Sequence, residues 1–352
     1  MFFLIFLSVS ASAQKSSFKI LIDDNQKKCI CDVVIRGKVY YIEIDKKKYP
    51  IEGVTVADIT KLKKEIANHE NVPFDNIIIG NGSNEILELA ARAFLNPDTS
   101  SIASKHAFAV YKIVTQSAGA SMIEVPTCNW GHDLNSFADH LENNTRVIFI
   151  ANPNNPTGTY NSHDEVHSLL KKVPSSVLVV LDCAYFEYVT KEDYVKPIDL
   201  LSEFDNLLIT KTFSKIHGLA SIRVGYGIAH PTLIEVFNRI RQPFNVNTLA
   251  QAMAAVAIND HEHIHQSIEL NSQQYDFLFD QLSKLGLECI PSVGNFITFK
   301  GNFIGKEMFN NLMKKGVIVR SVDLYDMKDF IRVTIGTEAE NLKFLNALKE
   351  LL

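Results

Sequence analysis

The chain has 352 residues, of which 46% are hydrophobic and 21% are charged, and this composition excludes a disordered or fibrous protein. The formal net charge of −5, with no long basic block, argues against nucleic acid as a partner. The length suits one large α/β domain and a smaller one, because single hydrophobic cores stop growing at roughly 250–300 residues.

The first residues, "MFFLIFLSVSASAQ", contain a short apolar run followed by Ala11-Ser12-Ala13, which is like a signal-peptidase site. They lack the basic start that signal peptides carry, and the run is shorter than the about 20 apolar residues that span a bilayer. We therefore expect a cytoplasmic protein with no membrane partner. Export through residues 1–14, an N-terminal strand and an extension from a misplaced start stay as alternatives.

Residues 1–48 are expected to form an N-terminal segment ahead of the main body. Within it, residues 18–48 predict short strands with charged turns, since apolar and polar residues alternate there. A helix is expected next, over residues 55–70, because apolar residues from Val56 to Ile66 fall on one face at helical spacing.

Apolar runs then alternate with helical stretches, which is the pattern of β-turn-α units. In the stretch "SNEILELAARAFL", Ser83 is placed to cap a helix. The predicted strands are "NIIIG", "SIAS", "RVIFIA", "SVLVVL" and "NLLIT". This alternation predicts the α/β class, with a mostly parallel sheet covered by helices on both faces. Ligands bind at the C-terminal ends of the strands in such sheets, so the chemistry should lie in the loops that follow them.

The pattern changes after about residue 245. A long helical stretch covers roughly residues 248–285, and short strands and helices follow it. We predict a large domain of residues 49–245 and a smaller α+β domain of residues 246–352.

The five cysteines give no sign of a disulfide framework or a metal site. Their number is odd, and only Cys29 and Cys31 are close in sequence. Zinc-ligand spacing is not seen in the sequence, so we predict no bound metal and reduced thiols in a reducing compartment.

Polar groups follow several of the predicted strands. The stretch "GNGSNE", from Gly80 to Glu85, opens a helix, so its backbone N–H groups suit either a phosphate cradle or a tight turn. The stretch "ANPNNPTGTY" ends another strand and places the amide of Asn155 at the ligand edge. In "LDCAYFEY", Asp182 ends a buried run and Tyr185 follows three residues later. A carboxylate there needs a partner, which could be a helix cap, an arginine or a cationic ligand.

The stretch "ITKTFSKIHGLASIR" contains two lysines, Lys211 and Lys215. Lysines usually lie on the surface. Thr212, Ser214 and Arg223 nevertheless surround Lys215 with groups that bind phosphate, and a reactive lysine needs a partly buried, positively charged setting. We interpret Lys215 as a chemical reagent and Lys211 as an ordinary charge with a structural role.

Together these groups form the set that pyridoxal 5′-phosphate requires. Its aldehyde needs a lysine, its pyridine nitrogen needs an acid, and its phosphate needs amides, hydroxyls and a cation. The order NPNNPTG, D-x-A-Y, S-K and R resembles the fold-type I aminotransferases, and within them the histidinol-phosphate aminotransferase family of class II. The resemblance runs from about Tyr49 to the C-terminus.

This resemblance implies a pyridoxal-phosphate-dependent transaminase of histidine biosynthesis. It would convert L-histidinol phosphate and 2-oxoglutarate to imidazole acetol phosphate and L-glutamate. By the same resemblance, Lys215 would form the Schiff base and shuttle a proton at the substrate α-carbon. Asp182 would pair with the pyridine nitrogen, Asn155 and Tyr185 would bind the 3′-oxygen, and Phe108 would stack on the ring.

The remaining site residues implied by the resemblance bind anions. The phosphate of the cofactor would be held by Gly82, Ser83, Asn84, Thr212, Ser214 and Arg223. Tyr49 would reach the phosphate in a neighbouring subunit, which implies a homodimer with shared active sites. Arg332, helped by Arg320, would grip the carboxylate of glutamate and the phosphate of histidinol phosphate, since an arginine fork suits both anions.

Two features depart from the family pattern. The N-terminal stretch "LIDDNQKKCICDVV" lacks the usual Asn-Pro-x-Gly of the substrate lid, and Ser321 stands where a proline follows the equivalent of Arg320. Other aromatic or aliphatic amino acid aminotransferases therefore stay as alternatives, as does a pyridoxal-phosphate decarboxylase of the threonine-phosphate type. A non-catalytic regulator is disfavoured, because no helix-turn-helix segment precedes the core and Lys215 is present.

Overall fold

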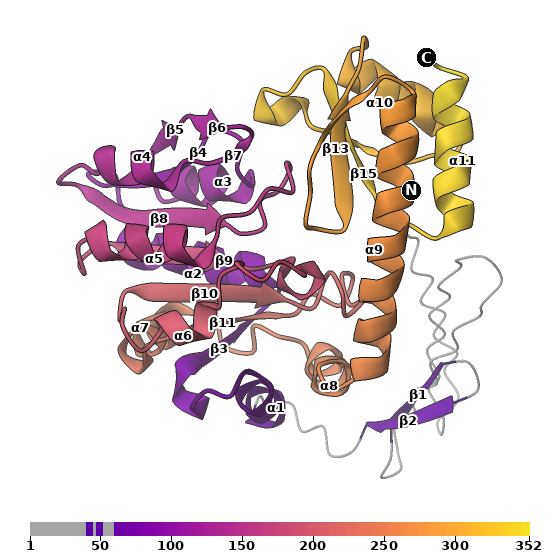
Figure 1. Ribbon diagram of the computed structural model, residues 1–352. Helices are drawn as coiled ribbons and strands as arrows, with labels where there is room; N and C mark the ends of the chain where they lie inside the picture. The colour runs from indigo at the N-terminus through magenta and orange to yellow at the C-terminus, as the bar shows by residue number, and fades with distance from the viewer. Residues whose placement is uncertain (1–39, 45–46, 52–59) are drawn as a thin grey trace, which may run out of the picture. The chain divides into compact units, whose positions relative to one another are not determined.

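The computed structural model describes residues 40–44, 47–51 and 60–352 (Figure 1). The chain forms two compact units, Met1–Ile59 and Thr60–Leu352. In the first unit, β1 (Tyr40–Ile44) and β2 (Lys47–Ile51) pair antiparallel. The signal-like residues 1–14 and the strands expected between residues 18 and 39 lie outside the described residues.

The second unit is built on a seven-stranded sheet with the order β3-β11-β10-β9-β8-β4-β5. Its strands are β3 (Ile77–Gly80), β4 (Ser100–Ser104), β5 (Ser121–Val125), β8 (Thr145–Ala151), β9 (Leu178–Asp182), β10 (Leu207–Thr212) and β11 (Gly225–Ala229). The neighbouring strands run parallel from β10 to β5, while β11 is antiparallel to both β10 and β3. The mostly parallel sheet predicted from the alternating pattern is confirmed.

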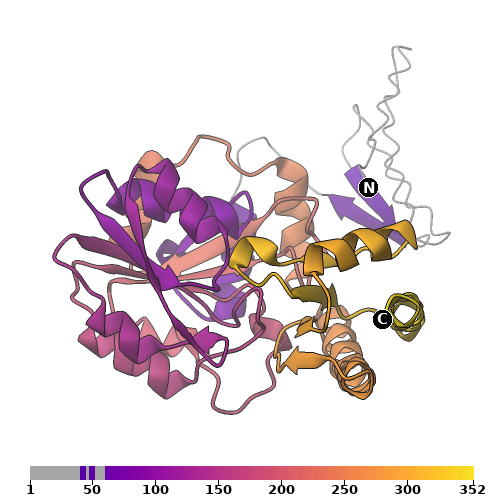
Figure 2. The same ribbon diagram turned by 90° about the horizontal axis from the view of Figure 1, so that it is seen from above.

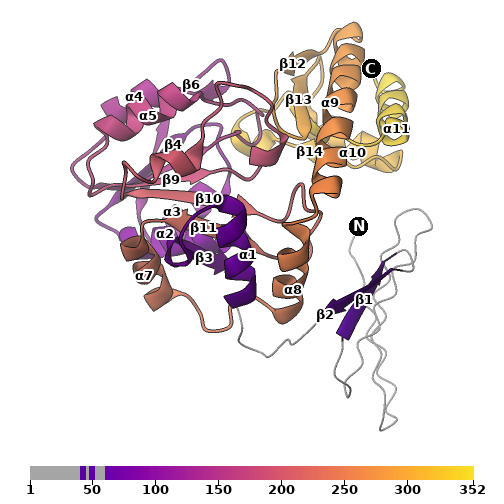
Figure 3. The same ribbon diagram turned by 60° about the horizontal axis from the view of Figure 1, so that its bottom comes forward.

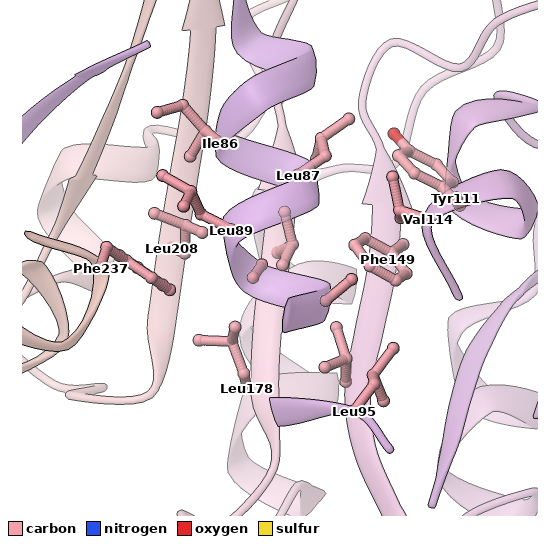
Figure 4. Packing of buried hydrophobic residues seen from close by; sticks show 14 of the residues in the cluster. Ile86, Leu87, Leu89, Leu95, Tyr111, Val114, Phe149, Leu178, Leu208 and Phe237 are labelled. Carbon is pink, nitrogen blue, oxygen red and sulfur yellow. The ribbon is translucent and has the colours of Figure 1, made fainter. Parts of the chain in front are cut away.

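Helices cover both faces of this sheet, as expected. One face carries α2 (Ser83–Phe94), α3 (Val110–Ser117) and α7 (Pro231–Ile240), and Figure 3 shows α5 (His163–Lys172) on the opposite face. Residues of α2 such as Ile86 and Leu87 pack with Phe149 of β8 and Phe237 of α7 in one buried cluster (Figure 4). This apolar layer fixes the strands whose ends form the cavity described below.

The second unit also contains eight further elements along the described chain. They are α1 (Thr60–Glu70), η1 (Phe74–Asn76), β6 (Thr127–Cys128), β7 (Gly131–His132), α4 (Leu134–Asp139), η2 (Phe186–Tyr188), α6 (Pro197–Leu200) and η3 (Asp323–Tyr325). Helix α1 buries Leu62 and Ile66, as its periodicity predicted, whereas Val56 and Ile59 lie outside the described residues.

A smaller, antiparallel sheet lies beside the large one (Figure 2). Its order is β12-β13-β15-β14, with β12 (Glu288–Ile290), β13 (Phe296–Lys300), β14 (Arg320–Ser321) and β15 (Phe330–Thr334). The helices α9 (His261–Lys284), α10 (Gly305–Lys314) and α11 (Glu338–Lys349) pack on it. The predicted α+β character of the C-terminal part agrees with these elements, and the domain boundaries at residues 49 and 246 stay predictions.

Two details differ from the expectations. The helical stretch over 248–285 is two helices, α8 (Thr248–Ala257) and α9, because the side chain of Asp260 accepts a hydrogen bond from His263 N and starts a new helix. Ser83 does not cap α2: Gly82 is the N-cap, with φ 78°, and Ser83 is the first helical residue. In the described part of the chain, every helix is too short or too polar to cross a membrane.

Candidate active site

A cavity of about 190 Å³ lies where three adjacent parallel strands end. Ala151, Asp182 and Thr212 are the last residues of β8, β9 and β10, and all three line it. The complete lining is Ser83, Asn84, Phe108, Ala151, Pro153, Asn155, Asp182, Ala184, Tyr185, Thr212, Ser214, Lys215 and Arg223. Most of the residues singled out in the sequence therefore meet at one place, at the strand ends where a ligand was expected.

Asp182 is the buried carboxylate of the cavity, with only 4% of its surface exposed. Tyr111 Oη donates to Asp182 Oδ2 at 2.9 Å, and Thr210 Oγ1 donates to Asp182 Oδ1 at 3.0 Å. Burial raises the pKa of Asp182, while these two hydrogen bonds and the charge of Lys215 oppose the rise. Its side-chain partners are hydroxyls, which do not neutralise a carboxylate, so this arrangement favours the cationic-ligand interpretation over a helix cap or an arginine.

Neither Tyr111 nor Thr210 was recognised from the sequence. Thr210 lies directly opposite Asp182 in the parallel pairing of β10 with β9, a relation that appears only once the strand register is known. Tyr111 follows Phe108 by three residues in the stretch "HAFAVY", so helical spacing was the one available signal.

Lys215 lies in the loop after β10 and lines the cavity. Its Nζ is 4.9 Å from the centre of the Tyr185 ring. The Tyr185 ring in turn packs edge-on against Phe296 of β13, with the ring centres 5.2 Å apart. A primary amine, a phenol and the Asp182 carboxylate thus border the same space, which is the donor set expected for the pyridine end of the cofactor.

At the other end of the cavity, cationic and hydroxyl groups surround the start of α2. Arg223 adopts a left-handed backbone conformation, with φ 62°, and its Nη1 lies 3.4 Å from Ser214 Oγ. A Cβ atom at Gly82 would lie 2.5 Å from Arg223 Nη2, and one at Gly225 would lie 2.4 Å from Ser83 N. The two glycines let the guanidinium and β11 approach the first turn of α2, where helix N–H groups favour an anion.

The small sheet contributes Arg332, whose Nη1 donates a hydrogen bond to Asn155 Oδ1. Its guanidinium carbon lies 4.7 Å from the centre of the Phe296 ring. Arg332 Nε is buried and has no hydrogen-bond partner among the described residues, so this donor is available to an anion. Arg320 is exposed and lies directly opposite Arg332 in the β14–β15 pairing.

Lys211 is not an ordinary surface charge, and this part of the interpretation is wrong. Only 3% of its surface is exposed, and its Nζ lies 2.8 and 3.0 Å from the two carboxylate oxygens of Glu70. Tyr226 Oη donates to the same carboxylate at 2.5 Å. Glu70 ends α1, far from Lys211 in the sequence, so the local pattern held no sign of the pair. Lys211 is a buried structural lysine.

The residues of the cavity fit pyridoxal 5′-phosphate. A cavity of about 150 Å³ admits benzene, so 190 Å³ accommodates a substituted six-membered ring. The amine of Lys215 and the carboxylate of Asp182 lie on the same cavity as Arg223 and the start of α2. Tyr49 belongs to β2, in the first unit, and its contact with a partner's phosphate stays a prediction.

Comparison with known proteins gives one consistent result. The family model "Aminotransferase class I and II" matches residues 52–348. The histidinol-phosphate aminotransferase of Methylobacillus flagellatus is 50% identical over 278 residues, which is 79% of this chain and 75% of that protein.

Solved structures agree on the fold. The histidinol-phosphate aminotransferase of Sinorhizobium meliloti, in complex with pyridoxal-5′-phosphate, superposes with a TM-score of 0.79 at 23% identity, covering 85% of this chain and 84% of that one. The L-threonine-O-3-phosphate decarboxylase of Porphyromonas gingivalis gives 0.73 at 22% identity, covering 83% and 88%. At these identities the likeness shows the fold and does not distinguish the two reactions.

Proposed function

Because the chain belongs to the aminotransferase class I and II family, we propose that it transfers the amino group of L-histidinol phosphate to 2-oxoglutarate. The protein is a pyridoxal-phosphate-dependent aminotransferase with a fold-type I architecture, so the predicted family, fold, enzyme class and cofactor are confirmed. The substrate pair is the proposal. It is supported by the 50% identity to the histidinol-phosphate aminotransferase of Methylobacillus flagellatus and by the hydrogen bond between Arg332 and Asn155.

One observation carries the proposed chemistry: Lys215, Asp182 and Arg223 border a single cavity. Pyridoxal 5′-phosphate, when bound, supplies the carbonyl carbon that takes up the amino group and the ring that withdraws electrons. Lys215 would move a proton from the α-carbon of the amine to the cofactor's carbonyl carbon, and it would move a proton in the opposite direction when 2-oxoglutarate is the acceptor. Asp182 would hold a proton at the ring nitrogen, because an ionised carboxylate stabilises positive charge there.

The other residues in and around the cavity would orient the cofactor and the substrate. Asn155 and Tyr185 would donate hydrogen bonds to the 3′-oxygen of the ring, and Phe108 would stack on its face. The phosphate would be held by Gly82, Ser83, Asn84, Thr212, Ser214 and Arg223. Arg332 binds the carboxylate of glutamate and, with Arg320, the phosphate of histidinol phosphate. A guanidinium fork serves both anions, so one site can accept the two substrates in turn.

We also propose a homodimer in which Tyr49 of one copy contacts the phosphate in the partner. Three exposed apolar side chains near α8 support it. Phe244 is 74% exposed and has φ 57°, a strained conformation for a phenylalanine. Leu249 and Val256 of α8 are 42% and 53% exposed, and their spacing puts them on one helix face. A second copy that covered these side chains would remove apolar surface from water. A role in histidine biosynthesis would place this enzyme in the cytoplasm.

The test is an assay of the purified protein with L-histidinol phosphate and 2-oxoglutarate. We expect glutamate and imidazole acetol phosphate to form in equal amounts. The Lys215→Ala variant serves as the control for chemistry that does not depend on this lysine. Release of CO₂ from a phosphorylated amino acid without glutamate would instead establish the decarboxylase. A strong preference for another aromatic or aliphatic amino acid would assign a different transaminase substrate.

A further inference from the structure

Tyr111 is a fully buried tyrosine that joins two walls of the cavity without lining it. It lies in the first turn of α3, and its ring stacks on Phe149 of β8, with centres 4.9 Å apart and planes 7° from parallel. Figure 4 shows the rings of Tyr111 and Phe149 next to each other at one side of the apolar cluster. The phenol oxygen of Tyr111 donates to Asp182 Oδ2 at 2.9 Å.

The same ring also supports Phe108. The Phe108 ring meets the Tyr111 ring edge-on, with centres 5.8 Å apart and planes at 89°, and Tyr111 N donates to the Phe108 carbonyl at 3.0 Å. Phe108 and Asp182 both line the cavity. One buried side chain therefore contacts the aromatic group at the face of the expected ring and the carboxylate at its edge.

We propose that Tyr111 is the positioning residue for the pyridoxal phosphate ring, with its aromatic ring holding Phe108 and its hydroxyl holding the Asp182 carboxylate. The inference rests on the cofactor and does not depend on which amine is the substrate. Packing against Phe149 fixes the phenol in place, and a fixed donor restricts the carboxylate to one orientation.

The hydroxyl has an electrostatic effect as well. A buried carboxylate is ionised only if donors replace the lost water, and here Tyr111 and Thr210 each supply one hydrogen bond, to different oxygens. Burial and the neighbouring Asp182 charge raise the pKa of Tyr111 well above its ordinary value, so the phenol keeps its proton and stays a donor. Removal of this hydroxyl leaves the Asp182 carboxylate with one donor fewer and favours its protonated form.

The experiment compares cofactor-free wild type with Tyr111→Phe, which keeps both ring contacts and removes only the hydroxyl. Titration with pyridoxal phosphate, followed by its visible absorption, should show an affinity about tenfold lower. The acid limb of the binding curve against pH should move to higher pH. In the cofactor-free proteins, the infrared band of the protonated Asp182 carboxyl should also appear at higher pH in Tyr111→Phe. The loss of that band in Asp182→Asn assigns it.

Tyr226→Phe is the matched control, because it removes a buried hydroxyl from a different carboxylate, that of Glu70. It should lower thermal stability and leave the cofactor affinity, the acid limb and the infrared band unchanged. A Tyr111→Leu variant should bind the cofactor more weakly than Tyr111→Phe, since it also removes the ring that supports Phe108.

The proposal is overturned if Tyr111→Phe binds the cofactor as wild type does, with the same acid limb and infrared titration. Equal shifts in Tyr111→Phe and Tyr226→Phe would overturn it too, because they would mean general destabilisation. These measurements are made without any amine substrate. A failure to convert histidinol phosphate would therefore count against the proposed function and leave this inference standing.

Discussion

Arg332 on the small antiparallel sheet donates a hydrogen bond to the side-chain oxygen of Asn155, in the loop after β8 of the large sheet. The contact joins the residue expected to bind the substrate anion to one expected to bind the cofactor. An anion bound by Arg332 would share the guanidinium with Asn155 or displace it, so we expect substrate binding to alter the position of the Asn155 side chain.

Replacement of Arg332 by lysine should therefore weaken substrate binding more than it slows the chemical step. A lysine supplies a point charge and cannot form the two-pronged contact. The loss of one charge-assisted hydrogen bond should raise KM for 2-oxoglutarate about tenfold to a hundredfold. Steady-state kinetics test this, with Arg146→Lys, outside the cavity lining, as the control. An unchanged KM would remove Arg332 from the anion site.

Lys215→Ala should lower kcat by about 10²- to 10⁴-fold, which is the usual contribution of a positioned proton-transfer group. The visible absorption of the bound cofactor should also change, because the amine no longer reacts with it. Spectra of the purified variant and glutamate formation measure the two effects. The exposed Lys191 provides a lysine control, and Lys191→Ala should leave both readouts as in wild type. Normal turnover by Lys215→Ala would contradict the assignment.

The sequence was sufficient to predict those cavity residues that stand out from their immediate neighbours in the chain. Asp182 and Lys215 could be found because a carboxylate or a lysine after an apolar run needs an explanation. Thr210 and Tyr111 could not be found this way, since they reach Asp182 through strand register and helix packing. The cap of α2 was misassigned because glycine is also common at the N-cap, and Gly82, one residue before Ser83, takes that place with φ 78°.

The buried pair of Lys211 and Glu70 gives a stability prediction that is separate from catalysis. Removal of one partner leaves an uncompensated buried charge, so Lys211→Met should lower the free energy of unfolding by about 3–5 kcal/mol. The double variant Lys211→Met/Glu70→Leu should recover most of this loss, because both charges are then absent. Urea unfolding at pH 7 of the wild type, both single variants and the double variant gives the coupling.

The same pair should contribute to acid unfolding. Burial acts to raise the pKa of Glu70, but Lys211 and the Tyr226 hydroxyl outweigh this effect, so the pKa lies below its ordinary value of 4.5. A carboxylate with a lowered pKa stabilises the fold above the ordinary value, and this stabilisation is lost as the pH falls through the lowered one. The double variant should therefore show a shallower loss of stability below pH 4.5 than wild type. An identical acid limb would show that the pair is not the cause.

Two buried histidines should cause the free energy of unfolding to decrease as the pH falls from 6.5 to 4. Burial lowers the pKa of His132 to about 4, and burial lowers that of His217 to about 4 as well. His132 Nε2 lies 2.8 Å from the Ala151 carbonyl, which only accepts, so Nε2 carries the proton and Ser104 donates to Nδ1 at 2.6 Å. The neutral ring is thus the form that fits.

Below pH 6.5 these histidines bind protons in the unfolded chain but stay neutral in the folded one. The free energy of unfolding must therefore fall as the pH falls. Each histidine contributes about 1.4 kcal/mol per pH unit, or about 3 kcal/mol over the whole window. His132→Gln keeps an amide donor and acceptor but does not titrate, so it should remove about half of this slope. Urea unfolding at several pH values between 4 and 7 measures the slope. A His132→Gln slope equal to that of wild type would mean that His132 is already protonated in the folded protein.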